Sequence, residues 1–175
     1  TMGRLEPALD FLLALGNREL HRQAIRGCSP LYTEEREWEL RYNDEPDGFV
    51  PAGQCRRPLP ELVAEFGPVD AVIVMDHGMA LAEYRHVGAD EWLSLDDPAL
   101  FAALLSRYDR VVTEAESLGI TVTFATVAPA DPTTPVAQIL GDGYEPRLMA
   151  HNDLVRSVAD SHPDTVLVVD LAAAV

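Results

Sequence analysis

Apolar residues along this chain recur at spacings that alternate between those typical of helices and those typical of strands. A first helix is predicted before Gly16, with four leucines on one face. Those leucines are Leu5, Leu9, Leu12 and Leu13. Residues 19–25 are a weak strand candidate, and a long polar stretch from Gly27 to Arg57 follows. We expect this stretch to be the main irregular loop of the protein.

The same alternation continues to the end of the chain. Helical spacing runs from Leu59 to Phe66, and the run from Asp70 to Met75, apolar after its first residue, predicts a buried strand. Residues 76–97 are predicted to form a second loop. The remaining predicted elements are a helix from Pro98 with Leu100, Leu104, Tyr108, Val111 and Val112 in line, a strand over 120–127, a Pro- and Gly-rich loop to Pro146, a helix over 147–161 and a strand over 165–170.

Strands that alternate with long helices predict parallel βαβ units with right-handed crossovers. We therefore expect an α/β fold, a three-layer doubly wound parallel sheet, in a single domain over residues 1–175. The pattern starts with a helix and stops just after a strand, so a first strand and a final loop are expected outside this sequence. Ligands of such sheets bind at the carboxyl ends of the strands, and the loops that follow strands are where chemistry is expected.

Composition and charge narrow the classes of function. Hydrophobic residues make up 47% and charged residues 24%, which is typical of a folded domain. The net charge is -16, every basic residue is Arg, and the only adjacent basic pair is Arg56-Arg57. Such an acidic chain repels phosphate backbones, so we expect no nucleic-acid partner. The sequence has neither a membrane-spanning apolar stretch nor a signal peptide, so membrane contact is expected only through a transmembrane domain outside it.

Few residues offer metal, cofactor or nucleophile chemistry. Cys28 and Cys55 have spacing that permits one disulfide, and structural thiols are the alternative. The five histidines form no HxH or HExxH motif, so no metal is predicted, and without a P-loop or a G-x-G-x-x-G motif no cofactor is predicted. No G-x-S-x-G motif surrounds any serine. The serines considered are Ser29, Ser94, Ser106, Ser117, Ser157 and Ser161.

Two predicted strand ends carry groups that could act in chemistry. The backbone N–H of Gly27 could approach a substrate and donate to a developing oxyanion, although a plain turn glycine explains it equally. The second is Asp76-His77-Gly78, where a histidine beside a carboxylate could act as a base or a ligand. A hydrogen-bonded histidine in a cap or a loop is the structural alternative.

The order of these pieces resembles the SGNH hydrolases (GDSL-type esterases), most of all the SGNH domain attached to bacterial membrane acyltransferases that O-acylate cell-surface sugars. Short matches over nearly the whole chain carry the resemblance. They are residues 1–9, 24–28, 55–58, 67–75 and 82–85, Trp92, the Asp97-Pro98 helix, residues 122–127, the helix around Asn152, and residues 167–171.

The resemblance implies roles for a few residues. Gly27 becomes an oxyanion donor, and Cys55 the second member of a cysteine pair with Cys28. The family's third block reads Asp76-His77-Gly78-Met79 here: His77 stands where the family has a glycine and Met79 where it has Asn or Trp, a departure at the second donor. Gly78 and His77 are therefore the other oxyanion-site candidates. The family's Ser nucleophile and its Asp-x-x-His pair are expected beyond the two ends of the sequence.

The resemblance further implies an ester hydrolase or O-acyltransferase that acts on acylated sugars of the cell envelope through a Ser-His-Asp acyl-enzyme mechanism. The printed segment alone is then expected to be inactive, and the parent protein to be membrane-anchored and extracytoplasmic, with a cytoplasmic location still open. An inactive SGNH-like domain that binds a sugar or a protein partner is the alternative, motivated by His77 and Met79. A third is a flavodoxin-like domain of unrelated function. The acyl group, the acceptor and the oligomeric state are not encoded in any motif.

Overall fold

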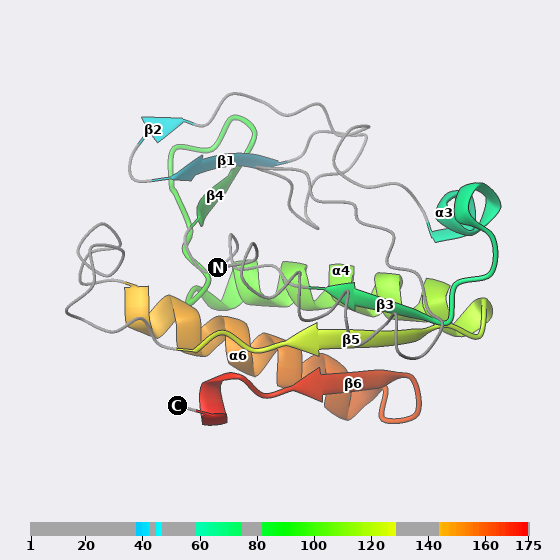
Figure 1. Cartoon of the computed structure of the whole chain (residues 1–175). Coiled ribbons are helices and arrows are strands. Elements are labelled where there is room, and N and C mark those ends of the chain that lie inside the picture. Colours follow the sequence, from blue (N-terminus) through cyan, green and yellow to red (C-terminus); the bar gives the residue numbers. More distant parts are fainter. Residues whose placement is uncertain (1–37, 43–44, 47–58, 75–81, 129–143, 175) are drawn as a thin grey trace.

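The computed structural model describes residues 38–42, 45–46, 59–74, 82–128 and 144–174 (Figure 1). In this part of the chain the strands form two sheets, one antiparallel and one parallel. The elements in chain order are β1 (Trp38–Tyr42), β2 (Glu45–Pro46), α3 (Leu59–Phe66), β3 (Ala71–Val74), β4 (Ala82–His86), α4 (Pro98–Ser117), β5 (Thr121–Ala125), α6 (Tyr144–Ser161), β6 (Val166–Val169) and the short 3-10 helix η2 (Ala172–Ala174).

The parallel sheet has the strand order β3-β5-β6. Its register places Ile73, Thr123 and Leu167 next to one another across the three strands. α4 precedes β5 and α6 connects β5 to β6, which is the alternation that the sequence predicts. The prediction of an α/β fold is confirmed at this level, as a mixed α/β structure with a small parallel sheet packed against helices.

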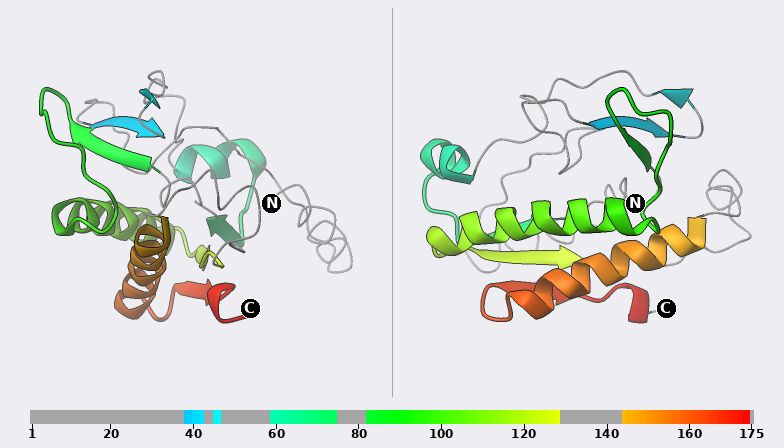
Figure 2. Two further views of the ribbon diagram at one scale, coloured as in Figure 1. Left: turned by 90° about the vertical axis from the view of Figure 1, so that its left-hand side faces the viewer. Right: turned by 180° about the vertical axis from the view of Figure 1, so that it is seen from behind.

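Both long helices lie against the same face of the parallel sheet (Figure 2). α4 packs on β5 and on α6, and α6 packs on β6. Between these helices and the sheet lies the main hydrophobic core, where the rings of Tyr108 and Phe124 meet edge to face with centroids 5.2 Å apart. The fully buried residues of this core include Leu100, Leu104, Val112, Ala115, Val122, Leu154 and Val158.

The helices begin and end where local chemistry favours it. The Asp97 carboxylate caps α4 by accepting from the backbone N–H groups of Ala99 (2.8 Å) and Leu100 (3.4 Å), and Pro98 occupies the first turn. α3 has the predicted bounds and stops before Gly67, whose φ of +88° suits glycine. In α4, Ala115 rather than Val111 completes the buried stripe, and α6 begins at Tyr144, three residues before its predicted start.

The prediction of two long loops is wrong where the antiparallel sheet lies. β1 and β2 fall within the stretch from Gly27 to Arg57, and β4 falls within residues 76–97. β1 pairs with β4 in an antiparallel register that joins Trp38 to His86, and β2 pairs with the other edge of β1. Apolar and charged residues alternate in β4, where Ala82 and Tyr84 are buried. The period-two pattern therefore explains the strands, although both segments are polar overall.

β3 differs from its prediction in burial. The apolar run after Asp70 is a strand, but its residues alternate between exposed and half-buried positions. Ile73 is 44% exposed, because its neighbours Val72 and Val74 pack against the core and successive side chains of a strand point to opposite faces. The prediction that β3 is a buried strand is therefore wrong for one of its two faces, as far as the described residues show.

Candidate functional site

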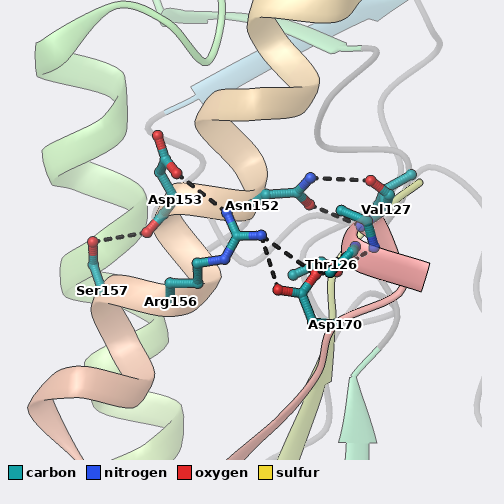
Figure 3. Close-up of polar contacts among 9 residues, drawn as sticks. Thr126, Val127, Asn152, Asp153, Arg156, Ser157 and Asp170 are labelled. Atoms are coloured by element: carbon teal, nitrogen blue, oxygen red, sulfur yellow. Dashed lines mark hydrogen bonds and ion pairs between the residues drawn. The ribbon is translucent and has the colours of Figure 1, made fainter. Parts of the chain in front are cut away.

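The carboxyl ends of the parallel strands meet at one edge of the sheet, where doubly wound folds bind their ligands. Four polar side chains lie close together at this edge, at the carboxyl ends of β5 and β6 (Figure 3). We call them the carboxyl-edge cluster: Thr126, Asn152, Arg156 and Asp170. Thr126 follows β5, Asp170 follows β6, and the other two project from α6.

Asn152 holds the chain as it leaves β5. Its side-chain oxygen accepts a hydrogen bond from the backbone N–H of Val127 (2.8 Å), and its Nδ2 donates to the carbonyl of the same residue (3.0 Å). Asn152 is 6% and Val127 7% exposed, so water has little access to these backbone groups. A primary amide is the side chain that can offer a donor and an acceptor side by side, as a neighbouring strand would. Asn152 thereby fixes the first residues after β5 against α6.

Thr126 and Asp170 join the ends of β5 and β6. The hydroxyl of Thr126 donates to Oδ1 of Asp170 (2.8 Å) and accepts from the backbone N–H of Ala172 (3.0 Å). Oδ1 of Asp170 also accepts from the backbone N–H of Ala173 at 3.1 Å, so the carboxylate caps η2. Thr126 is fully buried, whereas the side chain of Asp170 is 38% exposed. Together they set the direction in which the chain leaves β6.

Arg156 completes the cluster from α6. Its Nη2 lies 3.0 Å from Oδ2 and 3.3 Å from Oδ1 of Asp170, and its Nη1 lies 3.4 Å from the carboxylate of Asp153. The hydrogen bond from Thr126, followed by the one from Arg156, holds the pKa of Asp170 below its ordinary value of 3.8. Asp170 is therefore ionised at neutral pH, and its oxygens are occupied by donors. This arrangement suits a carboxylate that positions the backbone rather than one that removes a proton from a substrate.

The site residues expected from the sequence lie outside the described residues. This holds for Gly27, His77 and Gly78, and for Cys28 and Cys55, so their roles stay predictions. The structure does establish that Val74, the last residue of β3, lies beside Phe124 of β5 in a parallel register. β3 therefore ends at the same edge of the sheet as the carboxyl-edge cluster.

Four of the described serines donate hydrogen bonds within the protein. The hydroxyls of Ser117, Ser157 and Ser161 donate to backbone carbonyls three or four residues earlier. Such back-bonding is common for hydroxyls in helices. The hydroxyl of Ser94 donates to the carboxylate of Asp96.

The described histidines lie apart from one another. The ring of His86 stacks on Trp38, with centroids 3.8 Å apart, and His151 is 1% exposed on α6. His162 bridges to α4, where its Nδ1 lies 2.8 Å from the Glu116 carboxylate and its Nε2 lies 3.4 Å from the Asp109 carboxylate. No group of three or more His, Cys, Asp or Glu side chains among the described residues is placed to hold a metal ion.

A second polar group covers the outer face of the antiparallel sheet. Arg41 Nε lies 2.6 Å from the Glu83 carboxylate, and Arg147 of α6 reaches the other oxygen of Glu83 at 3.1 Å. The guanidinium groups of Arg41 and Arg85 each lie 4.5 Å from the ring centre of Trp92. These contacts attach the first turn of α6 to the antiparallel sheet.

Comparisons with protein families, with curated proteins and with solved structures found no match to this chain. None of the helices in the described ranges has the length and apolar character needed to cross a membrane.

Sequence reasoning did not identify the carboxyl-edge cluster. Thr126 and Asp170 are 44 positions apart, and Asn152 is 25 positions from Val127, so no local motif joins them. The available signal was positional, because Thr126 and Asp170 each lie at the end of a predicted strand. Asn152 in the next helix completes that signal.

Proposed function

We propose that this domain is the SGNH-like part of an ester hydrolase or O-acyltransferase that acts on acylated sugars of the cell envelope. One observation carries the proposal: β3, β5 and β6 are parallel, so the segments that follow them leave from one edge of the sheet. In the sequence, Asp76-His77-Gly78 come directly after Met75, the residue that follows the end of β3 at this edge. The carboxyl-edge cluster lies at the carboxyl ends of the two other strands, β5 and β6.

The finer fold belongs to the same proposal. It is a three-layer, doubly wound SGNH sheet, completed by a first strand upstream of the printed residues and a catalytic loop downstream. The described β3-β5-β6 sheet with α4 and α6 supports the central part of this arrangement. The proposed active site lies at its carboxyl edge.

The proposed reaction is acyl transfer through a covalent intermediate. A serine upstream of the printed residues attacks the ester carbonyl, and a histidine from the downstream loop takes the serine proton. The backbone N–H groups of Gly27 and Gly78, with His77 beside them, stabilise the tetrahedral oxyanion. The histidine protonates the leaving alcohol, and water or a sugar hydroxyl then releases the acyl group. The protein is proposed to act outside the cytoplasm, anchored through a further transmembrane domain.

Asp170 and Thr126 have a supporting role in this proposal. They hold the N–H groups of Ala172 and Ala173 and so fix the start of the segment after β6. In the resembling enzymes the Asp-His pair follows the last strand. A fixed exit from β6 would bring that pair to the edge shared by β3 and β5.

The test compares two proteins. One is extended at both ends by the residues that its gene encodes there. The other consists of residues 1–175 alone and serves as the matched control. The extended protein is expected to hydrolyse p-nitrophenyl acetate and to be labelled by a serine-reactive fluorophosphonate, and the printed chain to do neither. An extended protein that shows neither activity contradicts the enzymatic proposal and favours the inactive sugar- or protein-binding domain. Activity in the printed chain contradicts the placement of the serine.

A further inference from the structure

His162 joins the end of α6 to α4. It comes directly after Ser161, the last residue of α6, and its ring contacts two carboxylates of α4. Nδ1 lies 2.8 Å from the Glu116 carboxylate, and Nε2 lies 3.4 Å from Oδ1 of Asp109. Asp109 and Glu116 are about two helical turns apart, so they share one side of α4. Each ring nitrogen of His162 therefore faces a carboxylate.

The two contacts together require a particular form of the ring. A neutral imidazole has one N–H group, and its other nitrogen carries a lone pair. In that form the ring donates to one carboxylate, and its lone pair points at the other. The imidazolium has an N–H on each nitrogen and is attracted to both Asp109 and Glu116. The geometry of the junction is therefore satisfied by the charged ring of His162 and not by the neutral ring.

The contact with Asp109 is the one that depends most on the charge. Oδ1 of Asp109 is buried, although the side chain as a whole is 43% exposed, and it accepts no hydrogen bond of standard geometry within the described part of the chain. The side chain of His162 is 17% exposed, so water has limited access to the pair. A buried carboxylate oxygen that lacks a donor costs free energy. The imidazolium supplies that donor, and the neutral ring bound to Glu116 does not.

We propose that His162 is a pH-sensitive latch between α4 and the turn from α6 to β6. The charged ring holds both carboxylates, and loss of one proton releases Asp109 while the shorter contact to Glu116 persists. The backbone carbonyl of His162 accepts from the N–H groups of Thr165 (3.1 Å) and Val166 (2.9 Å), so the latch also holds the start of β6. The inference uses only this junction and does not depend on the proposed enzymatic function.

The surroundings of the latch determine the sign of its pH dependence. β5 and β6 carry no charged residue. The other charged residues beside the latch, near it in the sequence or next to Asp109 on α4, are Asp160, Asp164, Arg110 and Glu114. Three of these four are acidic, like the two carboxylates that contact the ring. The charged ring is therefore favoured in the folded state, and its contribution to stability is present in mild acid and lost as the pH rises.

The first test compares Tm at two pH values on either side of about 6.5, where an imidazole ordinarily loses its proton. Asp109→Asn should lower Tm by roughly 2–4 °C at pH 5.5. At pH 8.5 it should leave Tm unchanged or raise it, because the new amide can donate to the lone pair of the ring. Asp153→Asn is the matched control, since Asp153 is 66% exposed on α6 and contacts Arg156 instead. An equal loss at both pH values for Asp109→Asn would overturn the proposal.

The second test separates the two contacts of the ring. His162→Asn keeps a donor near the position of Nδ1 and has none near that of Nε2. Its loss of Tm should be larger at pH 5.5 than at pH 8.5, and adding Asp109→Asn should cause no further loss at either pH. A further loss from Asp109→Asn in this background would contradict the latch.

Hydrogen exchange reports on the turn itself. The protection factor of the Val166 amide, corrected for the intrinsic exchange rate, should fall by roughly fivefold between pH 5.5 and pH 8.5 in the unchanged protein. The fall should be clearly smaller in His162→Asn, which lacks the contact that the pH change removes. Falls of equal size in the two proteins would overturn the proposal, because the pH dependence would then arise elsewhere.

Discussion

The amide of Asn152 makes both of its hydrogen bonds to a single backbone residue, Val127, with distances of 2.8 and 3.0 Å. This contact joins a helix to the chain leaving a strand. It does so at the edge of the sheet where the proposed active site lies. The backbone of Val127, just after β5, is therefore held by the amide of one side chain.

Asn152→Ala is expected to lower the free energy of unfolding by about 2–3 kcal/mol. The substitution leaves the N–H and the carbonyl of Val127 without partners in a buried position. Urea unfolding followed by circular dichroism measures the change. The matched control is Asp153→Ala at the next position, where the side chain is 66% exposed and the effect should stay within about 0.5 kcal/mol. Equal effects at the two positions would contradict the role given to Asn152.

Asp170→Asn is expected to lower Tm at neutral pH and to matter less in acid. Because the pKa of Asp170 is lower in the folded state, its charge contributes stability above the ordinary pKa of 3.8, which applies to the unfolded chain. That contribution is lost as the pH falls through the folded pKa. Thermal scans between pH 7 and pH 3 should show wild type and variant converging at the acidic end. A constant difference across this range would mean that the charge is not what Asp170 contributes.

Glu83→Gln tests the attachment of α6 to the antiparallel sheet. Glu83 contacts both Arg41 and Arg147, and all three side chains are 22–25% exposed. We expect a loss of about 0.5–1 kcal/mol, smaller at 1 M salt than at low salt. Glu39→Gln makes the same chemical change on the same sheet and serves as the comparison. Among the described residues, the carboxylate of Glu39 pairs with Arg85 alone, at 2.5 Å. If the loss at Glu83 is unaffected by salt, the ion pairs do not account for it.

Leu104→Ala is expected to destabilise the domain by about 2–5 kcal/mol. Leu104 is fully buried between α4 and the parallel sheet, and the shorter side chain leaves a cavity there. Leu118→Ala just after the same helix removes the same atoms from a residue that is 39% exposed. Chemical denaturation should give free energies of unfolding for the two variants that differ by at least about 1.5 kcal/mol. Similar losses would contradict the placement of α4 on the core.

The sequence predicted the elements that have strong local signals. α3 has its predicted bounds, and α4 follows its apolar stripe and the Asp97-Pro98 start. β1 and β4 were missed because each is short and rich in charged residues, and the residues that pair between them are 40 to 48 positions apart. Their stability comes from that pairing and not from local propensity.

The candidate site was less predictable for the same physical reason. Thr126 and Asp170 become neighbours only when β5 and β6 pair, and Arg156 reaches Asp170 only when α6 packs on the sheet. Gly27 and His77 were selected from motifs and remain predictions. Position after a strand is the local feature that the observed and the expected residues share.

The charges on the outer face of β1 and β4 also determine how these two strands align. In the observed register Glu39 is opposite Arg85, and Arg41 is opposite Glu83. A slip of two residues keeps the buried face buried, but in one direction it sets Glu39 against Glu83, and in the other it sets Arg41 against Arg85. Either slip breaks both observed pairs of opposite charge and sets two like charges against each other. These four charged residues thus favour the observed alignment over slips that would keep the same face buried.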